Sequence, residues 1–230
     1  MIDLRRRQGR PLRIGHRGAA ALAPENTIAS LALALELGCD LVEFDVLDLD
    51  GSLVLAHSPA ELPGDVATLD EALAFLAGTE AGVQVDLKAP GAEPEVVESL
   101  RRHGLVERAV VSTFRPGSLR ALAALEPELC RGLTYPEDRF GVSRFTLVAR
   151  SGLAAMRSVL PRRIARMLSA ASANAAMLHW QVVTRAVVER CHGLGAPVLA
   201  WTVLDVEAVR RLDELGVDGL IVDDPRILQG

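Results

Sequence analysis

The sequence predicts an α/β protein whose parallel strands close into a TIM (β/α)8 barrel, and two observations support this prediction. Short apolar runs rich in β-branched residues alternate with longer stretches rich in alanine, leucine and arginine along all 230 residues. The chain contains eight such runs, which is the number of strands that closes this barrel. An open, doubly wound sheet is the alternative, but the glycine fingerprint that it requires after its first strand is missing.

The predicted strands leave room for a crossover helix between most successive pairs. In chain order they are Leu12–Gly15, Leu41–Asp45, Val83–Asp86, Ala109–Ser112, Arg131–Leu133, Ala175–His179, Val198–Trp201 and Gly219–Val222. Helical periodicity is clearest in Asn26–Leu37, Thr184–His192 and Val206–Leu215. Gly38 and Gly216 are expected to end the first and last of these helices, and a threonine opens the second as a candidate N-cap.

One further strand is predicted outside this alternation. Leu53–His57 follows the second strand across Asp50-Gly51, a dipeptide typical of two-residue hairpin turns. The strand is therefore expected to run antiparallel to an extension of the second barrel strand, as a β-hairpin arm that ends with His57 near the barrel rim. No repeat, low-complexity tract or linker is apparent, so residues 1–230 are expected to form one domain.

The composition excludes several classes of protein. With 50% hydrophobic and 24% charged residues, the chain is neither intrinsically disordered nor a fibrous rod. Its formal net charge of −5 argues against nucleic acid as a partner. Cys39, Cys130 and Cys191 are too few and too unevenly spaced for a disulfide framework or a zinc site, and are expected to be small apolar side chains in a reducing compartment. Neither a signal peptide nor a membrane span is apparent, so a cytoplasmic location is expected.

Residues that can carry chemistry gather at one end of the predicted barrel. In such barrels the working side chains lie at the carboxyl ends of the strands and on the loops that follow. These places hold His16 and Arg17 after the first strand, Glu43 and Asp45 at the end of the second, Asp86 and then Lys88 at the third, and Trp201 at the end of the seventh.

The acidic residues of this set predict a metal site. Glu43 and Asp45 are two positions apart on a strand and therefore project to the same side, where they repel each other unless a cation lies between them. Asp86 adds a third carboxylate from the neighbouring strand. Ligands that are all oxygen suit a divalent cation such as Mg²⁺ or Ca²⁺. The alternative is that Glu43 and Asp45 form salt bridges with arginines at the rim.

Two histidines are candidates for general acid and base catalysis. His16 lies in the glycine-flanked turn Gly15-His16-Arg17-Gly18, directly after a strand, and the hairpin arm directs His57 to the same rim. The remaining histidines, His103, His179 and His192, are expected to be structural.

The basic residues at the rim indicate that the bound group is a phosphate. Lys88 is the single lysine among 25 lysine and arginine residues, and a compact ammonium differs from a guanidinium in how it contacts phosphate oxygen in a confined pocket. A divalent cation, Lys88 and Arg17 would surround an anionic group. Cleavage of a P–O bond needs this neutralisation of charge, with a base and an acid in line.

These motifs, taken in order, resemble the glycerophosphodiester phosphodiesterase family. The resemblance rests on His16-Arg17-Gly18, Pro24-Glu25-Asn26-Thr27, Glu43-x-Asp45, Asp50-Gly51, His57, Asp86-Leu87-Lys88, Trp201-Thr202-Val203 and the segment Gly216 to Pro225. It implies a TIM barrel that uses a divalent metal to hydrolyse glycerophosphodiesters to sn-glycerol 3-phosphate and an alcohol. By position, it implies metal ligands at Glu43, Asp45 and Asp86, an acid/base pair at His16 and His57, phosphate contacts from Arg17 and Lys88, and a pocket wall at Trp201.

The chain departs from the family pattern in three ways. Asp86 stands where the family usually has glutamate, which makes this ligand one methylene shorter. Ser58 replaces the aspartate that commonly follows the second histidine. The family's substrate-capping insertion is nearly absent, because only Ser58–Ala67 separates His57 from the next helix. A more open site suits bulkier headgroups or lysophospholipids, and a non-catalytic barrel that binds a phosphorylated ligand is a further alternative.

The segment 141–178 contains no acidic residue and is amphipathic and cationic. Its arginines are Arg144, Arg150, Arg157, Arg162, Arg163 and Arg166, and its interleaved apolar residues are Phe145, Leu147, Met156, Leu160, Ile164 and Leu168. The pattern is typical of an outer barrel helix with a solvated arginine face. The alternative is peripheral contact with an anionic membrane, which would suit a lipid-derived substrate.

Overall fold

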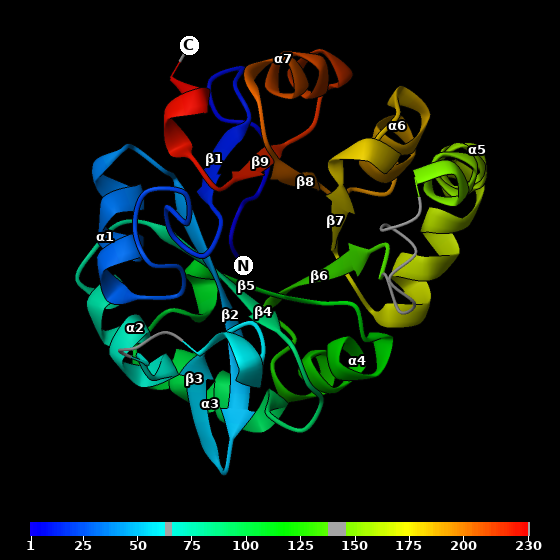
Figure 1. The fold of residues 1–230 in the computed structure, drawn as a ribbon. Coiled ribbons are helices and arrows are strands. Elements are labelled where there is room, and N and C mark those ends of the chain that lie inside the picture. The colour runs from blue at the N-terminus through cyan, green and yellow to red at the C-terminus, as the bar shows by residue number, and fades with distance from the viewer. Residues whose placement is uncertain (63–65, 138–145, 230) are drawn as a thin grey trace.

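A closed parallel barrel forms the centre of the molecule (Figure 1). The computed structural model describes residues 1–62, 66–137 and 146–229. Its strands are β1 Leu12–Gly15, β2 Leu41–Leu49, β3 Ser52–Leu55, β4 Gly82–Leu87, β5 Ala109–Thr113, β6 Cys130–Tyr135, β7 Ala175–His179, β8 Val198–Val203 and β9 Gly219–Val222. Strand β1 pairs in parallel with both β2 and β9, which closes the ring and leaves no free edge in it. The predicted TIM barrel is confirmed.

The predicted hairpin arm is also present. Strand β3 pairs antiparallel with the end of β2, outside the ring, with Leu49 opposite Ser52 and Val46 opposite Leu55. The turn residues Asp50 and Gly51 both have positive φ, 51° and 86°, as a two-residue hairpin turn of this kind requires. The strand is shorter than predicted and ends two residues before His57.

Seven α-helices surround the strands (Figure 1) among the described residues. They are α1 Ile28–Glu36, α2 Leu69–Ala77, α3 Glu93–Arg102, α4 Pro116–Leu125, α5 Thr146–Ala171, α6 Arg185–His192 and α7 Val206–Leu215, and short 3-10 helices lie at Pro59–Glu61, Val106–Arg108, Trp180–Val182 and Pro225–Leu228. Helix α1 begins later than predicted because Thr27, rather than Asn26, is its N-cap and accepts a hydrogen bond from the backbone N–H of Ser30. Thr184 caps α6 as expected, and Gly216 ends α7 at φ 84°.

Two apolar cores hold the barrel together. The larger lies between the strands and the helices. The smaller fills the barrel and consists of Leu4, Leu12, Ile14, Leu41, Val110, Cys130, Ala175, Met177, Leu199 and Ile221. Gly132 makes room for the Met177 side chain, because a Cβ added there would lie 2.4 Å from it. All three cysteines are buried and unbridged, as expected of small apolar side chains.

The described arginines of helix α5 face solvent, and three of its described apolar residues are buried against the barrel. Leu160, Ile164 and Leu168 are buried in the larger core, whereas the described arginines Arg157, Arg162, Arg163 and Arg166 are exposed. Arg144 and Phe145 lie outside the described residues, as do the side chains of Leu147 and Arg150. The apolar residues are thus committed to the core, and contact of the exposed arginines with an anionic membrane stays a prediction. No described helix is both long and apolar enough to span a membrane.

The turn from β1 into α1 depends on close backbone packing. Gly18 has φ 81°, and a Cβ added to it would lie 2.4 Å from the backbone of Ser30. Gly15 is equally confined, because its Cβ would lie 2.5 Å from the carbonyl oxygen of Gly18. Only glycine fits at both positions. The turn that carries His16 and Arg17 therefore depends on glycine on both sides of it.

We expect Gly18→Ala to lower the free energy of unfolding by about 3 kcal/mol, because left-handed strain adds to a steric clash with backbone. Gly216→Ala is the matched control, since Gly216 has φ 84° and open space around its Cβ position. It should cost only about 1 kcal/mol. Urea denaturation of both variants measures the difference. Equal losses would show that close packing of this turn contributes nothing.

Candidate active site

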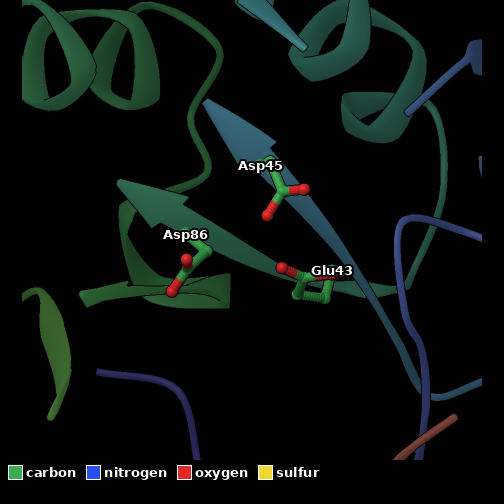
Figure 2. Close-up of side chains that lie close together, drawn as sticks. All are labelled: Glu43, Asp45 and Asp86. Atoms are coloured by element: carbon green, nitrogen blue, oxygen red, sulfur yellow. The ribbon is translucent and has the colours of Figure 1, made fainter. Parts of the chain in front are cut away.

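Three buried carboxyl groups meet at the carboxyl ends of two neighbouring strands (Figure 2). Glu43 and Asp45 lie on β2 and Asp86 on β4, where Asp45 and Asp86 are paired in register. One oxygen from each of the three side chains lies within 4.8 Å of the other two. Their exposed fractions are 4%, 0% and 5%, respectively. The structure therefore brings together the three residues that the sequence predicted as metal ligands.

Asp45 is the least exposed of the three and is surrounded by nitrogen groups of neighbouring side chains. Its Oδ1 lies 2.5 Å from Lys88 Nζ, and its Oδ2 lies 2.9 Å from Arg17 Nε. The side-chain amide of Asn26 makes two further hydrogen bonds to Asp45. Its Nδ2 donates to Asp45 Oδ2, and its Oδ1 accepts from the Asp45 backbone N–H. Burial raises the pKa of Asp45, but Lys88 and Arg17 outweigh this effect and lower it below the ordinary value. Asp45 is therefore ionised.

Lys88 connects the two aspartates. Its Nζ lies 2.6 Å from Asp86 Oδ2 as well as 2.5 Å from Asp45 Oδ1, and Ser112 Oγ donates to the other Asp86 oxygen at 2.6 Å. Burial lowers the pKa of Lys88, but the surrounding carboxylates outweigh it and raise the pKa above the ordinary value. The ammonium is therefore charged, and it offsets the repulsion between Asp45 and Asp86.

Glu43 has the weakest charge compensation of the three. Its Oε2 accepts a hydrogen bond from the backbone N–H of Arg17 at 2.8 Å and lies 4.0 Å from His16 Nε2. Burial, together with the charges of Asp45 and Asp86, raises its pKa to about 7 against the opposing effects of His16 and Lys88. A cation beside Glu43 would favour its ionised form. The three carboxyl groups offer only oxygen as a ligand, and this donor set fits a divalent cation such as Mg²⁺ or Ca²⁺.

His16 is held by a carboxylate that the sequence analysis did not assign. Asp223, directly after β9, lies 2.5 Å from His16 Nδ1 through its Oδ1. The other ring nitrogen, Nε2, is the one that lies near Glu43, at 4.0 Å from its Oε2. Burial lowers the pKa of His16, but Glu43 and Asp223 together outweigh it and raise the pKa above the ordinary value. The pairing fixes the orientation of the ring and favours its protonated form.

One cavity collects most of the predicted residues. It is lined by His16, Arg17, Glu43, His57, Asp86, Lys88 and Trp201. Asp45 is buried and is not among the lining residues, but it contacts both Lys88 and Arg17, which are. The hairpin arm thus delivers His57 to the same cavity as His16, although the two histidines are 41 positions apart in the sequence.

Trp201 forms one wall of this cavity. Its indole N–H donates to the Met177 carbonyl at 3.0 Å, and its ring meets those of Phe114 and His179 edge to face, with centroids 5.9 and 5.2 Å apart. These contacts fix the indole plane. His179 also accepts a hydrogen bond from the backbone N–H of Gln181, which agrees with the structural role expected for it.

The other two histidines lie outside the cavity, as the sequence analysis expected. His103 Nε2 lies 3.2 Å from Asp70, and His192 Nε2 lies 2.7 Å from Asp218. Neither is among the residues that line the cavity. Both therefore have structural partners away from the predicted site.

Sequence reasoning missed the residues that hold the site in place. Asn26 clamps Asp45, and Glu25 accepts a hydrogen bond from Arg17 Nη1 at 2.7 Å. Both belong to the Pro24–Thr27 motif, which the sequence analysis recognised without assigning it a role. Asp223 belongs to the recognised C-terminal motif in the same way. The sequence therefore showed that each of these residues belongs to a motif, but it did not show which side chain each one contacts.

Comparison with known proteins places these features in a family context. The model of the glycerophosphoryl diester phosphodiesterase family matches residues 16–72 and 65–227. A glycerophosphodiester phosphodiesterase from Caldanaerobacter subterraneus subsp. tengcongensis is 28% identical over 252 residues, which cover 94% of this chain and 95% of that protein.

Solved structures share the fold over nearly the whole chain. A phosphodiesterase from Oleispira antarctica, in complex with the product sn-glycerol-3-phosphate, is 26% identical, with a TM-score of 0.75 and 95% of each chain covered. A glycerophosphodiester phosphodiesterase from Agrobacterium tumefaciens str. C58 is 21% identical, with a TM-score of 0.70, and the match covers 94% of this chain and 98% of that one. The second likeness shows the fold alone.

We expect Asp223→Asn to lower the pKa of His16 in the metal-free protein. The substitution retains a hydrogen-bond acceptor for Nδ1 but removes the negative charge that favours the imidazolium, so the ring loses its proton at lower pH. An NMR titration of the His16 ring measures this. Asp224→Asn is the control, because Asp224 pairs with Arg226. A His16 pKa that is unchanged or higher in Asp223→Asn would contradict the assigned contact.

Proposed function

This chain belongs to the glycerophosphoryl diester phosphodiesterase family, and we propose that it hydrolyses glycerophosphodiesters to sn-glycerol 3-phosphate and an alcohol with a divalent cation. The observation that carries the proposal is the single cavity that contains two histidines, two cationic side chains and two of three clustered carboxyl groups. The Oleispira antarctica phosphodiesterase bound to sn-glycerol-3-phosphate supports the identity of the product.

The cationic residues are suited to bind the phosphodiester. Lys88 and Arg17 both line the cavity, and both contact the buried carboxylate of Asp45. Their charges would neutralise the equatorial phosphate oxygens as the P–O bond breaks. Glu43, Asp45 and Asp86 would hold Mg²⁺ or Ca²⁺, which supplies further positive charge beside the phosphate when bound.

The two histidines would divide the proton transfers. One removes a proton from the attacking oxygen, and the other gives a proton to the alcohol oxygen that leaves. In His16 the transferring atom is Nε2, because Asp223 occupies Nδ1. His57 reaches the same cavity from the end of the hairpin arm. The histidines come from different loops, which allows them to act on different sides of the phosphorus atom.

We expect release of glycerol 3-phosphate from glycerophosphocholine to need Mg²⁺ or Ca²⁺ and to stop when a chelator is added. His16→Ala should lower kcat by about 100- to 10,000-fold, because it removes a proton-transfer group. Glu43→Ala should lose the response to added metal. His103→Ala is the control, since His103 pairs with Asp70 outside the cavity, and it should retain wild-type turnover. Wild-type turnover in His16→Ala or Glu43→Ala would show that the site is assigned wrongly.

The same assay separates the alternatives that the short segment after His57 suggests. Faster turnover of lysophosphatidylcholine than of glycerophosphocholine would move the substrate class to lysophospholipids. Binding of glycerol 3-phosphate without turnover of any diester, even in saturating Mg²⁺ or Ca²⁺, would indicate a barrel that only binds a phosphorylated ligand. Either result would replace the proposed reaction while leaving the site in place.

A further inference from the structure

One flank of the barrel carries positive charge that no acidic side chain compensates. It is formed by the helices α4 and α5, which contact each other and lie side by side in Figure 1. Helix α4 contains one arginine and α5 contains five, and neither contains an acidic residue. The whole chain, by contrast, has a net charge of −5. A basic flank on an acidic protein is a candidate contact surface for an anionic partner.

Four exposed residues share the outer side of α5, because they follow the i, i+3, i+4, i+7 spacing of one helix side. They are Val159, Arg162, Arg163 and Arg166. The leucine and isoleucine side chains that pack this part of α5 against the core lie on the other side of the helix. The outer side therefore faces solvent as a stripe of three arginines with one valine, whose exposed fraction is 41%.

Arg120 continues this stripe onto α4. Its Nη1 donates to the carbonyl of Ala170 at 2.9 Å, and Ala170 follows Arg166 by one helical turn on the same side of α5. Glu126, the first acidic residue after α4, is paired with Arg101 of α3. We define the cationic flank as Arg120, Arg162, Arg163 and Arg166. None of these four arginines forms an ion pair with a carboxylate of the described residues.

The helices of the cationic flank reach the rim of the cavity. Arg115, the N-cap residue of α4, is exposed, and its Nη2 donates to the carbonyl of Lys88 at 3.3 Å. Lys88 lines the cavity. The surface that carries the uncompensated arginines is therefore continuous, through α4, with the residues proposed to bind the phosphodiester.

The side chains of this surface favour a lipid bilayer over other anionic partners. An anionic bilayer attracts arginine to its headgroups, and it also accepts an aliphatic side chain such as Val159 at the boundary with the acyl chains. Nucleic acid offers no such contact to a valine. Neither α4 nor α5 contains an aromatic residue on which an unpaired base could stack.

We propose that the cationic flank docks this protein on an anionic phospholipid surface. The four arginines contact the headgroups, and Val159 enters the interface between them. One valine is too small to anchor the protein, so binding depends mainly on charge and is reversed by salt. The inference goes beyond the proposed reaction and does not rest on it, because it follows from charge and exposure outside the cavity.

Co-sedimentation with vesicles tests the proposal. We expect the wild-type protein to bind vesicles of phosphatidylcholine and phosphatidylglycerol in equal parts at low ionic strength, and not to bind phosphatidylcholine alone. Salt at about 1 M should release it, because the screening length then falls to about 3 Å. Arg163→Gln/Arg166→Gln should bind the mixed vesicles about 30-fold more weakly, since each arginine near such a surface raises the affinity about fivefold.

Arg5→Gln/Arg7→Gln is the matched control. It changes the net charge by the same amount, but both arginines lie in the N-terminal segment and are paired with Asp3 and Asp40. This variant should bind the mixed vesicles as the wild type does. Urea denaturation should give the same midpoint for the wild type and Arg163→Gln/Arg166→Gln, because these arginines are exposed, so that weaker binding reports the surface and not the fold.

Three results would overturn the inference. Absence of wild-type binding to the mixed vesicles at low ionic strength would remove the lipid partner. Equal binding by the two double variants would mean that net charge, and not this flank, determines the contact. Binding of a double-stranded oligonucleotide without binding of vesicles would make nucleic acid the partner. None of these measurements needs turnover, so failure of the proposed reaction would not affect them.

Discussion

The burial of three carboxyl groups beside one another is the constraint on which this site depends. Charges removed from water are costly unless opposite charges compensate them. Lys88 and Arg17 supply this compensation for Asp45, and Lys88 also serves Asp86. Glu43 remains the least compensated and has a pKa of about 7. The cationic groups that suit a phosphate are therefore the same ones that allow the acidic residues to be buried.

The backbone around the first strand determines where one of these cations lies. Arg17 has φ 49°, between His16 and a glycine that no larger residue can replace without a clash. The backbone N–H of Arg17 contacts Glu43, while its guanidinium contacts Asp45 and Glu25. A single residue thus connects the first barrel strand to two acidic residues of the second. Movement of this turn would alter the charge balance as well as the geometry.

The barrel and its hairpin arm contribute different residues to the cavity. The ring supplies the acidic residues, Lys88 and the apolar base, because neighbouring parallel strands end at the same edge. The arm leaves the ring after Asp45 and returns His57 to the cavity. Asp86 is shorter than the glutamate usual in the family, yet it lies in register with Asp45 and shares Lys88 with it. The shorter side chain therefore still reaches the common centre.

Local patterns along the chain were enough to predict the barrel, the hairpin arm and the eight residues proposed for the site. Periodicity, turn residues such as Asp50-Gly51 and the places of polar residues at strand ends are properties of short segments, so they can be recognised without long-range contacts. The pairings of Asp223 with His16, of Asn26 with Asp45 and of Gln84 with Ser112 depended on the closed ring. Each joins residues 19 to 207 positions apart, and no local rule specifies which distant side chains will meet. The protonation states follow from those meetings, because burial and neighbouring charge exist only once the chain has folded.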